Sequence, residues 1–269
     1  MKYNFLGIDE GRQNIFKADT ASDTLEWKTS LEKFPIARSM QIIGKDHVLA
    51  GYENGFFIIE ISSGKIISSC GRWSNVTSVS RTGDGRTLVT GTDLENSKGI
   101  CVVTLDDNNK VIRKVSRKGR YVRLMSVTER NTFLLSVNRI VLETDSSLRI
   151  KRRFKSRKFF HAWKSLRLED DTTIVSAGYG ACMVRFSKKG KVIQKFGTRD
   201  DVPDEVSPFF YGGCELAPDG NILVANWQGH GPSNGRKGRQ LLCFSADGKY
   251  LNSWSYPKEV SSFQGLLLL

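Results

Sequence analysis

A short apolar segment recurs six times along the 269-residue chain, at intervals of 40 to 51 residues when the sequence is joined end to end. The six copies are Phe5–Ile8, Val48–Gly51, Leu88–Gly91, Leu134–Val137, Ile174–Ala177 and Leu223–Asn226. Repeats of about 20 to 50 residues are typical of solenoids and propellers, in which each unit buries its apolar faces only against its neighbours. The copies span the whole chain and leave no remainder for a second domain, so the sequence predicts one repeat domain over residues 1–269.

A second pattern identifies the repeats as β-structure. Alternating apolar residues lead into a polar turn and resume after it, as in FFIIEISSGKIISS (56–69) and LLCFSADGKYLNSW (242–254). Such alternation buries one face of a strand, and Asp-Gly or Lys-Gly at the turn supplies the positive φ that a tight hairpin needs. No segment shows a sustained helical period, so we expect antiparallel sheets and almost no helix.

Six units of this length, each with four strands, predict an all-β, six-bladed β-propeller. The expected blades are 1–32 together with 261–269, 33–72, 73–118, 119–158, 159–208 and 209–260. The N-terminus supplies only three strand-like segments before the second unit, and the C-terminus supplies one that is left over. Pairing the C-terminal strand with the N-terminal blade, as its innermost strand, closes the ring and removes an exposed edge.

The sixth unit carries the most distinctive repeat. In ELAPDGNILVANWQGHG (215–231), a Pro-Asp-Gly turn precedes a Leu-Val-Ala strand. This unit resembles the repeat of the PQQ-like, quinoprotein-type β-propellers, and the resemblance extends over the chain as a repeat pattern. The regularly placed tryptophans of PQQ enzymes are missing from this chain, so we expect no cofactor and rank a quinoprotein oxidoreductase last among the functions considered.

Composition narrows the class of protein further. A hydrophobic content of 39% and a charged content of 26% are typical of a soluble globular protein. The five cysteines are scattered over apolar segments without CxxC pairs, which favours buried reduced thiols and predicts no metal site. No apolar run is long enough for a transmembrane helix, and the N-terminus lacks the apolar segment of a secretory signal. We expect a monomer without membrane insertion that is cytoplasmic, or exported with its signal already removed.

Positive charge is concentrated in the middle of the chain. The net charge is +13, and residues 110–167 contain 18 Lys and Arg against three acidic residues. Nine of these cations fall on two predicted outermost strands and the segments after them, and we call them the basic flank: Arg113, Lys114, Arg149, Lys151, Arg152, Arg153, Lys155, Arg157 and Lys158. Their density favours docking on a polyanion, such as a polysaccharide, a nucleic acid or an acidic protein. The alternative is that they only protect outer edge strands from aggregation.

Aromatic and cationic side chains recur in the segments that lead into the innermost strands. Propellers as a group bind ligands over the central channel, on the face built by these segments and by the loops between second and third strands. The candidate ligand-binding residues are Arg38, Arg72, Trp73, Arg120, Tyr121, Arg123, His161, Trp163, Tyr211, Trp227, His230 and Phe263. Guanidinium groups beside aromatic rings suit a planar or sugar-like anion, such as an acidic saccharide or a nucleotide. Alternatively, the aromatic residues plug the channel and pack between blades.

Candidate catalytic residues are few, because no GxSxG or HExxH motif is present. His161 and His230 fall on the expected loop face, and with Tyr211 they are the candidates for acid–base catalysis. His230 belongs to the long Gly-rich loop 226–239, which we expect to project over the same face. We therefore favour a binding or scaffold propeller over an enzyme. The alternative is a lyase or hydrolase that acts on an acidic sugar through the loop-face histidines.

Overall fold

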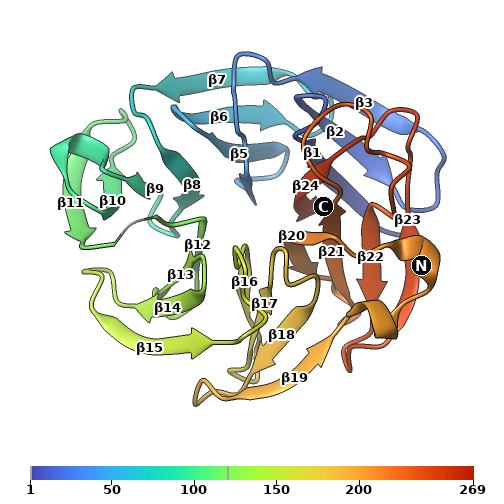
Figure 1. The fold of residues 1–269 in the computed structure, drawn as a ribbon. Helices are drawn as coiled ribbons and strands as arrows, with labels where there is room; N and C mark the ends of the chain where they lie inside the picture. The colour runs from blue at the N-terminus through green and yellow to red at the C-terminus, as the bar shows by residue number, and fades with distance from the viewer. Residues whose placement is uncertain (1, 120) are drawn as a thin grey trace.

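Six four-stranded antiparallel sheets form a closed ring in the computed structural model, which describes residues 2–119 and 121–269 (Figure 1). The chain is therefore an all-β, six-bladed β-propeller, as the repeats predict. Three short 3-10 helices, η1 (Leu94–Asn96), η2 (Arg199–Asp201) and η3 (Asp204–Val206), are the helical elements in the described part of the chain. None of these helices could cross a membrane.

The strands of each blade follow in order from the innermost to the outermost. The first three blades are β24 (Phe263–Leu268), β1 (Asn4–Asp9), β2 (Asn14–Asp19), β3 (Leu25–Ser30); β4 (Ser39–Ile42), β5 (His47–Tyr52), β6 (Gly55–Glu60), β7 (Ile66–Gly71); and β8 (Val76–Arg81), β9 (Thr87–Thr92), β10 (Ile100–Leu105), β11 (Val111–Arg117). The last three are β12 (Leu124–Val127), β13 (Phe133–Val137), β14 (Ile140–Thr144), β15 (Ile150–Lys155); β16 (Ser165–Arg167), β17 (Thr173–Ser176), β18 (Met183–Phe186), β19 (Val192–Phe196); and β20 (Phe210–Leu216), β21 (Ile222–Trp227), β22 (Leu241–Phe244), β23 (Tyr250–Trp254).

The C-terminal strand β24 completes the first blade and closes the ring. It pairs antiparallel with β1, so that Leu267 lies opposite Leu6 and Phe263 lies opposite Asp9. The expected sharing of one blade by the two ends of the chain is confirmed. This arrangement covers an edge of β1 that would otherwise carry a row of unpaired backbone groups.

Buried apolar side chains fill the spaces between neighbouring blades. At the junction of the first and sixth blades, Phe5 packs against Phe16, Phe263 and Trp254, with ring centroids 5.2 to 6.0 Å apart. Each fully buried side chain of this size contributes roughly 1.5–3 kcal/mol relative to an exposed one. Because a small sheet cannot bury both of its faces alone, the ring is held together by these contacts between blades.

The two faces of the ring are built from different connections. We call the upper face the one that carries the segments leading into the innermost strands and the turns between second and third strands. The lower face carries the turns between first and second strands and between third and fourth strands. Every candidate ligand-binding loop of the sequence belongs to a connection of the upper face.

Candidate functional site

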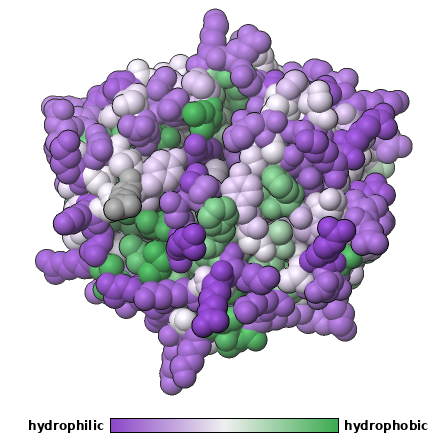
Figure 2. All heavy atoms as spheres, viewed as in Figure 1, coloured by the Kyte–Doolittle hydropathy of each residue, from purple (hydrophilic) through white to green (hydrophobic). Residues whose placement is uncertain are grey.

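Aromatic side chains from the fifth and sixth blades meet on the upper face. We call this group the aromatic cluster: Phe160, His161, Trp163, Tyr179, Phe209, Phe210, Trp227 and His230. Phe160, Tyr179 and Phe209 are 46%, 36% and 45% exposed, and they form an open shelf above buried tryptophans. Figure 2 shows hydrophilic residues around the rim of the disc and patches of hydrophobic residues nearer its middle. Exposed aromatic groups of this kind mark a binding surface more often than a structural one.

Backbone geometry brings two separate segments of the fifth blade into this shelf. Tyr179 follows Gly178 in the turn between β17 and β18, and its N–H donates to the carbonyl of Phe160 at 2.9 Å. Gly178 has a φ of 63°, and a β-carbon there would lie 2.2 Å from the carbonyl oxygen of His161. Only glycine permits this approach. As a result, the rings of His161 and Tyr179 lie 5.4 Å apart.

Three arginines border the aromatic cluster. Arg38 and Arg123 lie over the ring of Trp163, at 5.6 and 5.9 Å from its centroid, and Arg139 lies 5.4 Å from the centroid of Phe160. Within the described residues, none of these three guanidinium groups forms an ion pair. Their charges are therefore free to act on a bound ligand.

The predicted residue Tyr121 joins two of these arginines. The guanidinium of Arg123 stacks on its ring at 4.8 Å, and its hydroxyl accepts a hydrogen bond from Arg38 Nη1 at 2.6 Å. Arg123 Nε also donates to Asn138 Oδ1 at 2.8 Å. These neutral partners hold the guanidinium groups in place without cancelling their charge.

Titration of the neighbouring groups reflects this positive charge. Burial lowers the pKa of Arg123, and the nearby Arg38 adds to the decrease. Burial also lowers the pKa of His161, and the charges of Arg123 and Arg139 lower it further. His161 is therefore neutral near pH 7, and an anion bound beside it would reverse part of this effect.

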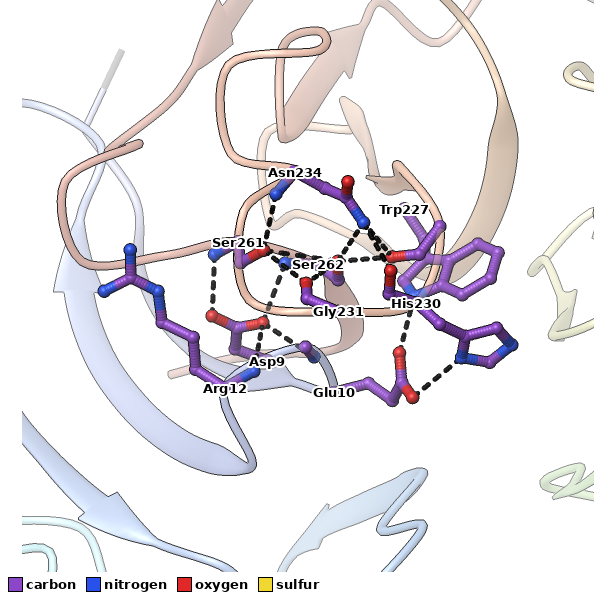
Figure 3. Close-up of polar contacts among 11 residues, drawn as sticks. Asp9, Glu10, Arg12, Trp227, His230, Gly231, Asn234, Ser261 and Ser262 are labelled. Atoms are coloured by element: carbon purple, nitrogen blue, oxygen red, sulfur yellow. Dashed lines mark hydrogen bonds and ion pairs between the residues drawn. The ribbon is translucent and has the colours of Figure 1, made fainter.

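A histidine–carboxylate pair lies at the other end of the aromatic cluster (Figure 3). His230 Nδ1 is 2.8 Å from Glu10 Oε1, and Trp227 Nε1 donates to Glu10 Oε2 at 3.2 Å. The imidazole is largely exposed, and it meets the ring of Trp227 at a centroid distance of 4.7 Å. Both His161 and His230 thus belong to one cluster, with Tyr179 and Trp227 in the row between them.

The Gly-rich loop that carries His230 is anchored to the segment before β24 (Figure 3). Asn234 Nδ2 donates to the carbonyls of Gly229 and His230, and Ser261 Oγ donates to the carbonyl of Gly231. The hydroxyl of the adjacent Ser262 also donates to Gly231, at 3.2 Å. These bonds fix the loop over the closure of the ring.

Four candidate ligand-binding residues are buried in the structure. Trp163 and Trp227 lie beneath the shelf, whereas Tyr211 and Phe263 lie between blades, which corrects their prediction as residues of the channel face. Tyr211 is fully buried in β20, and its hydroxyl donates to the carbonyl of Gly197 at 2.5 Å. Burial raises its pKa far above the ordinary range, so it cannot exchange a proton near neutral pH. Phe263 is also fully buried, between Phe5 and Phe16. Tyr211 and Phe263 lie near the start of innermost strands, where the side chain turns between blades instead of towards the channel.

Arg72 and Trp73 form a separate group at the third blade. The guanidinium lies 4.7 Å from the Trp73 ring, and both side chains donate to Glu95 Oε1, at 2.9 and 2.7 Å. Because Glu95 compensates the charge of Arg72, Arg72 and Trp73 attract an anion more weakly than the three arginines without ion pairs do. The remaining candidate, Arg120, lies outside the described residues.

Phe160, Phe209 and Phe210 of the cluster stand directly beside candidate residues of the sequence. Three further residues of the site lie outside the segments that the sequence singled out: Glu10, Arg139 and Tyr179. Each of them lies on a turn between the second and third strands of its blade. The repeats indicate that such turns build the upper face. Only the long loop 226–239 is conspicuous in the sequence, because the shorter turns give no signal of their own.

The basic flank lies on the outer surface of the third and fourth blades, on β11, on β15 and in the segments directly before and after β15. Eight of its nine members are exposed, and Arg152 is half-buried beside Glu143 at 3.7 Å. The sequence missed an extension from the fifth blade, where Lys188, Lys189 and Lys191 are exposed in the turn between β18 and β19. A β-carbon on Gly190 of this turn would lie 3.3 Å from Arg152 Cδ. The positive surface therefore continues over three blades.

Comparison with known proteins supports the fold class. No protein family and no curated protein matches the sequence. The structure is similar to a protein of unknown function from Bacteroides caccae, with a TM-score of 0.80 and 17% identity over 99% of both chains. It is also similar to a catalytically inactive histidine-to-alanine variant of virginiamycin B lyase from Staphylococcus aureus with quinupristin, with a TM-score of 0.64 and 10% identity over 99% of this chain and 92% of the lyase.

A third structural neighbour is the WD40 β-propeller domain of Doa1, with a TM-score of 0.61 and 12% identity over 95% of this chain and 80% of that one. At these identities the likeness concerns the fold alone. The chain is thus a member of the β-propeller class, and the PQQ-like resemblance holds only as a general likeness between propellers. Fold alone does not assign a function, so a function must be inferred from the site.

Proposed function

We propose that this protein is a binding propeller that recognises an anionic ligand on its upper face. The observation that carries the proposal is the group of three arginines without ion-pair partners among the described residues, Arg38, Arg123 and Arg139, beside exposed aromatic rings. Such cations attract an anion, and the shelf offers a flat surface for its apolar face. An acidic saccharide or a nucleotide combines both features.

The arrangement also favours binding over mere packing of the channel. A purely structural plug would bury its aromatic rings, but Phe160, Tyr179 and Phe209 remain more than one-third exposed. The neutral state of His161 adds a hydrogen-bond donor and an acceptor beside the arginines. A ligand that carries a carboxylate or phosphate together with hydroxyl groups therefore finds partners for each of its parts.

The first experiment is an array of acidic glycans, neutral glycans and nucleotides, followed by calorimetry on the best binder. The double variant Arg123→Met and Arg139→Met should weaken binding of the acidic ligand at least about tenfold, because each charge-assisted hydrogen bond contributes roughly 1.5–3 kcal/mol. The matched control is Arg86→Met with Arg199→Met, which removes the same charge from exposed positions elsewhere. Equal binding by both double variants would contradict the proposal.

The basic flank supports a second contact of the same kind, with a polyanion along the outer surface. Lys151, Arg153 and Lys155 are its exposed residues on β15, and we choose them over the half-buried Arg152. Their replacement by glutamate should weaken binding of heparin or single-stranded DNA. It should also reduce the slope of log affinity against log salt by about 3, since each lost cation removes about one unit.

The control for the flank variant makes the same change of charge at three exposed lysines of the second unit, Lys33→Glu, Lys45→Glu and Lys65→Glu. If both triple variants lose affinity equally, net charge alone attracts the polyanion. In that case the flank is only a protected edge.

A second candidate function, acid–base catalysis on an acidic sugar, is favoured by the pair of Glu10 and His230. The carboxylate at 2.8 Å orients the imidazole, and its other ring nitrogen remains available to a substrate. In the described part of the chain, no group of three or more metal-ligating side chains is present. A lyase would release an unsaturated uronate, whose absorbance can be followed during incubation with uronate oligosaccharides. His230→Ala should lower the rate at least about a hundredfold, and absence of turnover by the native protein contradicts this candidate.

A further inference from the structure

The channel through the middle of the ring holds a cavity of about 570 Å³ that shares Arg38 with the upper-face site and extends below it. Its wall carries apolar side chains from all six blades, including Ile42, Val79, Met125, Leu166, Leu216 and Leu266. Lys164 and Glu215 also line it, and they pair with each other. A volume of this size with a mostly apolar lining is typical of a small-molecule site.

The lower end of this cavity is apolar. Ile42 and Leu216 lie at the lower ends of β4 and β20, line the cavity and are each 41% exposed. Along the wall, the four residue steps from Arg38 to Ile42 span about 13 Å at 3.3 Å per residue. The cavity therefore extends between the lower face and Arg38, with a mostly apolar wall.

The upper end of the cavity is positively charged and has hydrogen-bond donors without acceptors. Arg38 lines this end, and its Nε is buried with no partner among the residues that the structure describes. Trp163 does not line the cavity, but its Nε1 also lacks a partner among the described residues, and its buried ring lies under the guanidinium of Arg38. Buried donors of this kind are costly unless a ligand satisfies them.

We propose that the channel binds a linear aliphatic carboxylate. Its head group accepts hydrogen bonds from the guanidinium of Arg38, and its chain extends between the innermost strands towards the lower face. The charge of Arg38 selects an anion, while the mostly apolar wall favours an aliphatic chain. This site goes beyond the proposed function, because its ligand enters from the opposite face and shares only Arg38 with the upper-face site.

The test uses the full-length protein and decanoate, whose extended length matches the passage, at concentrations below micelle formation. Calorimetry should show one site. Decanol should bind at least about tenfold more weakly, and decyltrimethylammonium should not bind. Arg38→Met should reduce the affinity for decanoate to that for decanol. The control is Arg86→Met, which makes the same change at an exposed position on the lower face and should leave the affinity unchanged.

A second variant distinguishes binding of decanoate in the cavity from its non-specific adsorption to a positively charged protein. Ser126 lines the cavity, and Ser126→Phe fills the passage without a change in charge. It should abolish binding of decanoate and decanol together; if the variant does not fold, Ser80→Phe on the neighbouring blade serves the same purpose. Unchanged binding in the folded variant, or equal affinity for decanoate and decanol, would overturn the proposal.

The two proposals can fail independently. Ser126→Phe should retain binding of the acidic glycan or nucleotide at the upper face, because the substitution lies below Arg38. Conversely, the double variant of Arg123 and Arg139 should lose the upper-face ligand and still bind decanoate. This result would show that the two sites bind independently. Absence of any upper-face ligand together with a decanoate site would remove only the proposed function.

Discussion

Asp9 Oδ1 accepts the backbone N–H of Ser262 at 2.7 Å, although 253 residues separate the two in sequence. The same carboxylate accepts the N–H of Ser261 through its other oxygen, at 2.7 Å. It also accepts the N–H groups of Gly11 and Arg12 in its own turn. One buried side chain thus connects the first hairpin of the chain to the segment that leads into the last strand (Figure 3).

Replacement of Asp9 by asparagine should destabilise the protein by about 1–3 kcal/mol, because an amide nitrogen would face the N–H of Ser261 and leave a buried donor without an acceptor. The free energy of unfolding in urea is the measurement. Asp107→Asn is a control at an exposed carboxylate of a turn. An equal effect of both changes would show that closure does not depend on Asp9.

The ring closure also rests on packing at β24. Phe263→Ala should cost about 3–5 kcal/mol, the usual range for loss of a buried phenylalanine. Phe209→Ala removes the same atoms from a ring that is 45% exposed, and should change stability by no more than about 0.5 kcal/mol. Denaturant titration of the two variants measures the difference. Phe209→Ala should instead weaken binding of the upper-face ligand, which distinguishes a shelf residue from a core residue.

Deletion of residues 261–269 removes the innermost strand of the first blade and exposes the edge of β1. The truncated chain should lose cooperative unfolding and expose apolar surface to a hydrophobic dye. A truncated chain with the melting curve of the full chain would contradict closure of the ring by β24.

Gly178 should tolerate no side chain, because a β-carbon would lie 2.2 Å from the carbonyl oxygen of His161. Gly178→Ala should destabilise the protein by more than about 1 kcal/mol and displace Tyr179 from the shelf. Gly44 also has positive φ, at 75°, but nothing lies within 4 Å of its β-carbon position. Gly44→Ala therefore measures the backbone cost alone, about 1 kcal/mol or less. Equal effects in urea unfolding would contradict the role of the close contact.

The titration of His161 tests the electrostatics of the site. Its pKa is lowered from the ordinary value of 6.5, and Arg139→Ala should raise it because one of the causes is removed. Since the native pKa is the lower one, the unfolded chain takes up the proton first, and stability is lost as the pH falls below about 6.5. NMR of the imidazole measures both states. A bound anion should raise the pKa; no response to a saturating acidic ligand would place that ligand elsewhere.

The fold could be predicted from the sequence because the repeat and the alternation of apolar residues define each strand locally. In addition, the first blade lacks one strand, and the strand-like segment at the C-terminus can fill that position. The directions in which individual side chains point could not be predicted from the sequence. Tyr211 and Phe263 stand in segments equivalent to that of Trp163, yet a bulge or a shift of register decides whether a ring turns towards the axis or between blades. The sequence around Gly178 does not predict that Tyr179 lies beside His161, because that contact depends on the packing of two separate segments. The exposed basic flank could still be predicted, because long cationic side chains on outer strands remain exposed in either register.

Ring closure by β24 has a consequence for biosynthesis. While the chain emerges from the ribosome, blades two to six can each pair their own four consecutive strands, but the first three strands must wait for a partner made last. Until then the nascent protein is an open crescent with one unpaired edge, a state prone to sheet-to-sheet aggregation. The slowest step of maturation should therefore be this long-range capture, and chaperones would act during that interval.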